Sequence, residues 1–120
     1  MRNWSPWFIE HSRVPLWLSK LAPIEINAIT LFCFVFSRGE ISERTKRHET
    51  IHFQQYLETL VVGFLVIYLL DYLCRLVAYR DGARAYRMIC FEQEAYQYDD
   101  RLAYLERRKR FNWVSKLWVY

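Results

Sequence analysis

One stretch of the chain, residues 43–58, has the sequence ERTKRHETIHFQQYLE, and it predicts a helix with two histidines on one face. No proline or glycine interrupts it, and Ser42 directly before it suits the N-cap position. Glu43 lies in the first turn, where a carboxylate complements the helix dipole. Because His48 and His52 are four residues apart, both imidazoles can reach one ion from the same side of the helix.

The pattern from His48 to His52 has the residue types and the spacing of a catalytic zinc site. Zinc accepts two imidazole nitrogens, needs a third protein ligand and keeps one position for water. Glu49 follows the first histidine and is placed to accept a proton from that water as the water attacks a carbonyl. The sequence therefore predicts zinc as the cofactor and Glu49 as the general base.

The third ligand has to come from another part of the chain. No histidine follows the motif, so a carboxylate is expected. Glu92 and Glu94 lie two residues apart in a predicted helix and point to nearly opposite faces, so only one of them can meet the metal. Glu92 is favoured, because its face also carries Ala95 and Asp99 among small and apolar residues that can pack on the motif helix. Glu94 is the alternative.

These residues resemble a known family. A His-Glu-x-x-His motif followed by a glutamate on a downstream helix is similar to the gluzincin class of zinc metallopeptidases. The segment FEQEAY resembles that class's signature Phe-Glu-x-x-Ala-Asp, and Phe91, Glu92 and Ala95 match it. The resemblance implies hydrolysis of a peptide or amide bond in a peptide or protein substrate, with Glu92 as the third ligand. Tyr96 stands where the family has an aspartate that orients a ligating histidine, and its phenol can still form a hydrogen bond there.

The strings HETIHFQQ and FEQEAY together also resemble a set of small Bacteroidetes-type HExxH proteins, over about residues 24–113. In gluzincins a strand beside the motif helix lines the cleft and pairs with extended substrate. The apolar segment Ile24–Phe36, predicted to be a buried strand, is in the right order for that part and equally suits an ordinary core strand. Gln55, three residues after His52, is within reach of the site for a hydrogen bond.

The helical pattern continues past the motif to Tyr79, either unbroken or with a break near Gly63. Residues 60–70 (LVVGFLVIYLL) are apolar on all sides, which is typical of a helix buried in a core or embedded in lipid. This run is too short to span a bilayer, which needs about 20 residues. Residues 80–82 (RDG) predict a break, and a second long helix is expected over residues 83–110.

The length of 120 residues favours a single domain over residues 1–120. Residues 1–23 are rich in Trp and Pro and are expected to form an irregular arm with a short helical stretch near Leu16–Leu21. The aromatic residues 111–120 are expected to form a tail, either a strand or an interfacial anchor.

Three widely separated cysteines without a CxxC pair argue against a disulfide framework and favour the cytoplasm. No secretory signal peptide is expected, because prolines and ionisable residues interrupt any apolar run at the start.

The net charge of +4 and the aromatic content of 18% fit an anionic membrane surface or a nucleic acid. Nucleic acid is ranked low as a partner, because no nucleic-acid-binding module accompanies the basic residues. The cations in residues 106–110 (ERRKR) are explained by the dipole at the end of the second helix. With the aromatic tail beside them they also suit a membrane surface.

The sequence therefore predicts an α+β, mainly α domain, in which two long helices face each other across a zinc ion. One short strand or hairpin lies beside the cleft. The expected function is zinc-dependent hydrolysis of a peptide or amide bond. The alternatives are a non-hydrolytic protein stabilised by zinc, because a small core gains much from such a link, and a membrane-associated interaction protein without metal.

Overall fold

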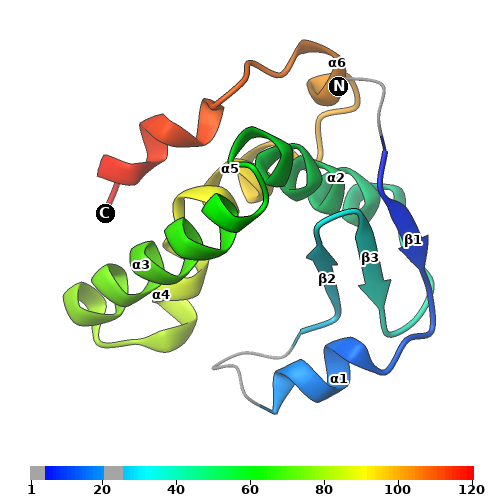
Figure 1. The fold of residues 1–120 in the computed structure, drawn as a ribbon, viewed down its shortest axis with the longest axis horizontal. Coiled ribbons are helices and arrows are strands. Elements are labelled where there is room, and N and C mark those ends of the chain that lie inside the picture. The colour runs from blue at the N-terminus through cyan, green and yellow to red at the C-terminus, as the bar shows by residue number, and fades with distance from the viewer. Residues whose placement is uncertain (1–4, 21–25) are drawn as a thin grey trace.

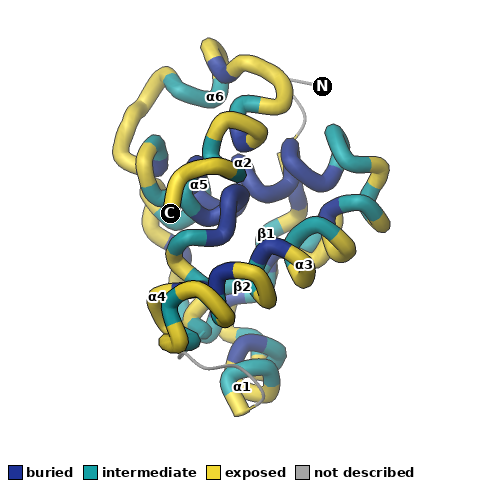
Figure 2. Tube along the Cα trace, turned by 90° about the vertical axis from the view of Figure 1, so that its left-hand side faces the viewer, coloured by how far each residue is buried: buried dark blue, intermediate teal, exposed yellow. Residues whose placement is uncertain are grey.

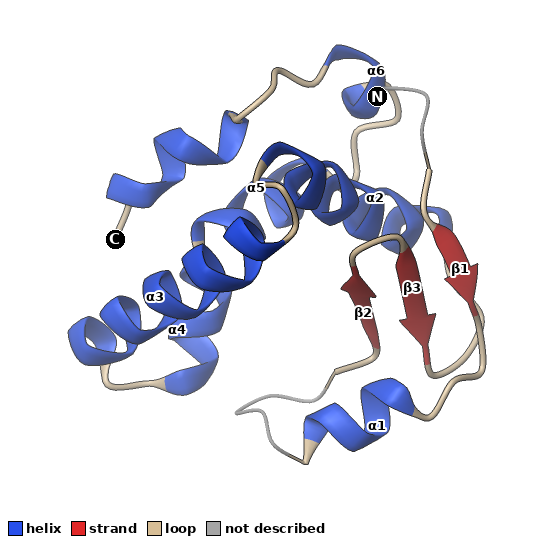
Figure 3. Ribbon diagram, viewed as in Figure 1, coloured by secondary structure: helices blue, strands red, loops and turns tan. Residues whose placement is uncertain are grey.

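A computed structural model describes residues 5–20 and 26–120 of the chain. The predicted α+β, mainly helical fold is confirmed. Most helices lie to one side of a small sheet, and one short helix, α1, lies at one end of its strands (Figures 1 and 3). The strands are β1 (Trp7–Ile9), β2 (Ala28–Leu31) and β3 (Phe34–Ser37). The helices are α1 (Val14–Ser19), α2 (Glu43–Glu58), α3 (Val62–Tyr79), α4 (Gly82–Met88), α5 (Cys90–Tyr98), α6 (Tyr104–Arg107) and the 3-10 helix η1 (Asn112–Trp118).

The sheet has the strand order β1-β3-β2, with β1 parallel and β2 antiparallel to β3. The prediction of one strand over Ile24–Phe36 is wrong in its described part, because the chain reverses at Phe32, which has a φ of 55°, and forms the β2–β3 hairpin. The predicted irregular arm is wrong in part, since Trp7–Ile9 forms β1, which pairs with β3. The short helical stretch expected near Leu16–Leu21 corresponds to α1, although Leu21 lies outside the described residues. β2 is an edge strand, and the Tyr56 hydroxyl on α2 donates to the Thr30 carbonyl on β2.

The long helical pattern breaks between α2 and α3, just before Gly63. Ser42 caps α2 as predicted, since its Oγ accepts from the Thr45 N–H at 3.2 Å. Leu60 and Val61 have positive φ values of 58° and 66°, and these two residues end one helix and start the next in a new direction.

The predicted second long helix is wrong: the structure has α4, α5 and α6 in its place. No proline or glycine causes the break between α4 and α5, where Ile89 adopts an extended ψ of 135°. Asp71 on α3 supplies the physical reason, because its Oδ2 accepts the Cys90 N–H at 2.7 Å and so caps the first turn of α5. The other oxygen, Oδ1, accepts from Arg75 Nε at 3.1 Å, which keeps this buried carboxylate paired.

The aromatic tail forms the helical turns of η1 and is not a strand. Trp113 is buried against Phe91, with ring centroids 4.7 Å apart, and Phe91 in turn stacks on Phe64 at 4.5 Å. The fully buried Arg75 donates to the carbonyls of Lys116, Leu117 and Val119. The tail therefore closes the aromatic core from one side.

The burial of the two longest helices is the opposite of what their polarity suggests. The polar helix α2 is buried from His48 to Tyr56, whereas the apolar helix α3 buries only Phe64, Asp71 and Arg75 (Figure 2). Glu49 and Gln55 of α2 are tolerated inside because they have partners on β2 and α5.

Candidate metal centre

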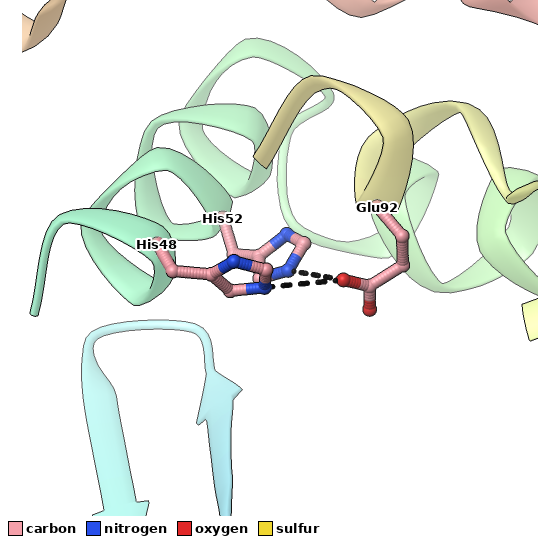
Figure 4. A group of neighbouring side chains, drawn as sticks. All are labelled: His48, His52 and Glu92. Carbon is pink, nitrogen blue, oxygen red and sulfur yellow. Dashed lines mark hydrogen bonds and ion pairs between the residues drawn. The ribbon is translucent and has the colours of Figure 1, made fainter. Parts of the chain in front are cut away.

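Three of the predicted site residues meet between α2 and α5. His48 and His52 point from α2 toward the carboxylate of Glu92 on α5, and all three side chains are buried (Figure 4). Glu92 Oε1 lies 3.3 Å from His48 Nε2 and 2.9 Å from His52 Nε2. One ligand atom from each residue lies within 4.8 Å of the others. These atoms form the donor set of two imidazole nitrogens and one carboxylate oxygen that catalytic zinc uses.

The far ring nitrogen of each histidine also has a partner. His48 Nδ1 lies 3.0 Å from Asp99 Oδ2, and His52 Nδ1 lies 2.8 Å from Gln55 Oε1. Because these oxygens accept the Nδ1 protons, both Nε2 atoms are left to face Glu92. Gln55 thus lies where the sequence analysis expected a hydrogen bond near the site.

Sequence reasoning missed the role of Asp99. The sequence indicated only that Asp99 shares a helix face with Glu92. Glu92 precedes it by seven positions, about two helical turns, and this spacing was the available signal that Asp99 lies near the site. Asp99 directly follows α5, where Arg44 Nε donates to its Oδ1 at 2.8 Å and Arg47 Nε to its carbonyl at 2.7 Å. Arg44 thus holds the carboxylate that contacts His48, and Arg47 holds the backbone of the same residue.

We expect Asp99→Asn to weaken zinc binding by about 10- to 100-fold, the usual cost of losing a partner that orients a ligand. The amide no longer carries the negative charge that stabilises His48, although its size is unchanged. The measurement is the zinc dissociation constant in competition with a chromophoric chelator. The matched control is Asp100→Asn at the next, exposed position, which should bind zinc as wild type does. Equal affinities for the two variants would contradict the role of Asp99.

Tyr96 does not make the contact expected of the aspartate in the gluzincin signature. Its ring packs edge-on against His48, with centroids 4.5 Å apart, and Arg87 lies over the Tyr96 ring at 4.7 Å from its centroid. Tyr96 therefore supports the histidine by ring packing, while the orienting carboxylate comes from Asp99, three positions later.

Glu94, the alternative third ligand, is turned away from the two histidines. Its Oε2 accepts from Arg108 Nε and from the Tyr104 hydroxyl, each at 2.6 Å, and its Oε1 accepts from Gln55 Nε2 at 2.9 Å. Glu94 thus contacts the site indirectly: it accepts a hydrogen bond from Gln55, and Gln55 in turn contacts His52.

Glu49 lies beside the three-residue group, and its carboxylate is held by the sheet. The Thr30 hydroxyl on β2 donates to Glu49 Oε2 at 2.6 Å and lies 3.1 Å from the Glu49 carbonyl. The edge strand therefore positions the residue that the motif predicts to be the general base.

Tyr68 is a second residue that sequence reasoning missed. Its hydroxyl donates to Glu92 Oε2 at 2.7 Å, whereas the other oxygen, Oε1, faces His52. Tyr68 belongs to the apolar run on α3, where no pattern distinguishes it from its neighbours.

Two cavities meet at the site. An apolar one of about 320 Å³ reaches Glu49, His52 and Glu92, and its walls come largely from β2 and from α3. A more polar one of about 340 Å³ reaches His48 and Glu49, and Arg44, Arg87 and Asp99 contribute to its walls. Glu49 lines both cavities, so the candidate site lies in a cleft that is apolar at one end and charged at the other.

Burial and the neighbouring carboxylates act in opposite directions on the histidines. Burial alone lowers the pKa of His48, but hydrogen bonds with Asp99 and Glu92 outweigh it and raise that pKa to about 10. The pKa of His52 is also raised, against burial, by the charge of Glu92. Burial raises the pKa of Glu92, yet the two imidazoles hold it well below its usual value. The three groups therefore form an ion-paired cluster, and a metal ion would have to displace protons from it to bind.

No protein-family model, no curated protein and no solved structure matches this chain.

Proposed function

We propose that this protein is a zinc-dependent hydrolase of the gluzincin type that cleaves a peptide or amide bond. The observation that carries the proposal is the convergence of His48 Nε2 and His52 Nε2 on a single oxygen of Glu92. The donor set suits zinc, each imidazole is oriented by its own partner, and the group is buried.

In this proposal, zinc supplies Lewis acidity, which polarises a carbonyl and makes water acidic enough to lose a proton near neutral pH. Glu49 accepts the proton of the attacking water and later passes it to the leaving amine. Thr30 keeps the Glu49 carboxylate aimed at the cleft through its hydrogen bond to Oε2. Tyr68 holds the second oxygen of Glu92, so the ligand keeps one orientation.

The cleft favours the hydrolase over the alternative of a zinc ion that only ties two helices together. A purely structural site is closed by protein ligands, whereas a catalytic one needs room for water and substrate. Cavities of about 320 and 340 Å³ reach the histidines and Glu49. The apolar walls of the first suit apolar side chains of a peptide or protein substrate.

We expect protein purified without added zinc to contain about one zinc per chain, and His48→Ala/His52→Ala to contain almost none, since a single ion shares the two imidazoles. Elemental analysis measures the metal content. The control is His11→Ala, because His11 is an exposed residue of the segment between β1 and α1. A folded wild-type protein that refuses added zinc would overturn the proposal, and zinc without hydrolysis of any peptide in a broad library would favour the structural role.

A further inference from the structure

The outward side of α3 is uniformly aliphatic. From Val62 to Ala78 its exposed positions follow the three- and four-residue spacing of one helix face, and over this fully described helix they carry only Val, Leu, Cys and Ala. Leu70 is 58% exposed and Val77 is 78% exposed. We call this surface the outer face of α3; it is the part of the helix drawn in yellow in Figure 2.

The inner side of the same helix carries its only charged residues. Asp71 and Arg75 face the protein, pair with each other at 3.1 Å and bind the start of α5 and the tail. A surface helix in water has the opposite arrangement, with charges outward and aliphatic side chains inward. Charges that face protein and aliphatic side chains that face outward are typical of a helix in contact with lipid.

The outer face suits lipid better than a protein partner. Cores of protein interfaces are enriched in aromatic residues and arginine and carry about one hydrogen bond per 100–200 Å². The exposed positions from Val62 to Ala78, all described, carry no aromatic ring, no charge and no hydroxyl or amide group. The helix has a mean hydropathy of 1.7 over 18 residues, of which 17% are buried.

The C-terminal end of α3 carries arginines and aromatic rings. Arg80 is exposed there, and Arg84 lies over the ring of Tyr79 at 4.2 Å from the centroid. Tyr79 also contacts Tyr120, and the neighbouring Trp118 is 81% exposed. Aromatic rings and arginines concentrate at the level of the headgroups, and the net charge of +4 complements an anionic surface.

We propose that the outer face of α3 docks on a phospholipid bilayer, with the helix lying along the membrane surface. Its inner side packs on α4, so α3 cannot be surrounded by lipid and the rest of the protein stays on the water side. Leu65 and Leu69 belong to the outer face and also line the apolar cavity that reaches Glu49. The apolar end of the cleft therefore opens at the membrane surface. The docking itself does not depend on a metal.

The test measures binding of the full chain to sedimented vesicles, of phosphatidylcholine alone and of phosphatidylcholine mixed with phosphatidylglycerol. We expect wild-type protein to bind both kinds and the anionic vesicles more tightly. Leu70→Gln should lower the partition coefficient by about tenfold, because a polar amide replaces an inserted side chain. The matched control is Leu102→Gln, since Leu102 is 83% exposed in the turn after α5 and should leave binding unchanged.

Four outcomes would overturn this proposal. In the first two, wild-type protein binds neither kind of vesicle, or the two variants lose vesicle binding equally. In the third, wild-type protein binds only the anionic vesicles and high salt abolishes that binding. In the fourth, the protein binds no vesicle and forms a stable dimer in solution that Leu70→Gln dissociates. Circular dichroism checks that both variants fold. Zinc content is measured on the same samples, so a failure of docking is distinguished from a failure of the metal site.

Discussion

Glu49→Gln is expected to keep zinc at the wild-type level and to lower the rate of hydrolysis by about 10²- to 10⁴-fold, the range for loss of a general base. The amide has the size of the carboxylate and can still accept the Thr30 hydroxyl, but it cannot take a proton from water. Glu49 lies outside the group of His48, His52 and Glu92, so metal content should not change. The measurements are the zinc content and the kcat/KM for the best substrate in a peptide library.

The matched control is Glu43→Gln, which makes the same change in the first turn of α2, where the side chain is 79% exposed. That variant should hydrolyse the peptide at the wild-type rate. A Glu49→Gln protein that retains activity would disprove the proposed role of Glu49. A variant that loses its zinc would show instead that the carboxylate helps to hold the metal.

Arg108→Ala is expected to lower the free energy of unfolding by about 3–5 kcal/mol, the cost of removing one partner from a buried ion pair. Arg108 donates to Glu94 Oε2 and to Glu58 Oε2, each at 2.6 Å, and the side chains of Glu58 and Glu94 are 1% and 0% exposed. Without the guanidinium, two carboxylates stay buried with no cation between them. Because a domain has only about 5–15 kcal/mol of stability, this loss is large.

Urea unfolding of the metal-free protein at neutral pH measures this effect. The control is Arg107→Ala at the preceding, exposed position, which should change the free energy of unfolding by less than about 0.5 kcal/mol. Similar values for the two variants would refute the structural role of Arg108. The same network should reach the site, because Glu94 holds Gln55 and Gln55 holds His52.

The basic run at residues 106–110 shows how a local explanation fails. As part of a predicted helix end, its cations needed no partner beyond the helix dipole. In the structure α6 ends at Arg107, and Arg108 turns inward while Arg107, Lys109 and Arg110 stay exposed. Arg107 and Arg110 carry the same guanidinium as Arg108, so the position of Glu58 and Glu94 on packed helices selects Arg108.

Asp99 and Tyr96 show the same limit at the candidate site. The family signature directs attention to position 96, but the carboxylate oxygen that reaches His48 comes from position 99. Asp99 directly follows α5 with a helical backbone conformation, so it lies on the same side of the helix as Glu92. The sequence contains that shared face, but only the packing of α5 on α2 brings the Asp99 carboxylate to His48 and Arg44.

The sequence by itself determined the motif helix, its cap at Ser42, the shared face of His48 and His52, and the preference for Glu92. Helical periodicity and capping act within a few residues, so they can be deduced from the chain alone. Tertiary structure decided which polar groups are buried together, that α2 lies inside and the apolar α3 outside, and that Asp71 divides the second long helix. The physical reason is that a polar side chain is stable inside only with a partner, and here those partners come from elements distant in sequence.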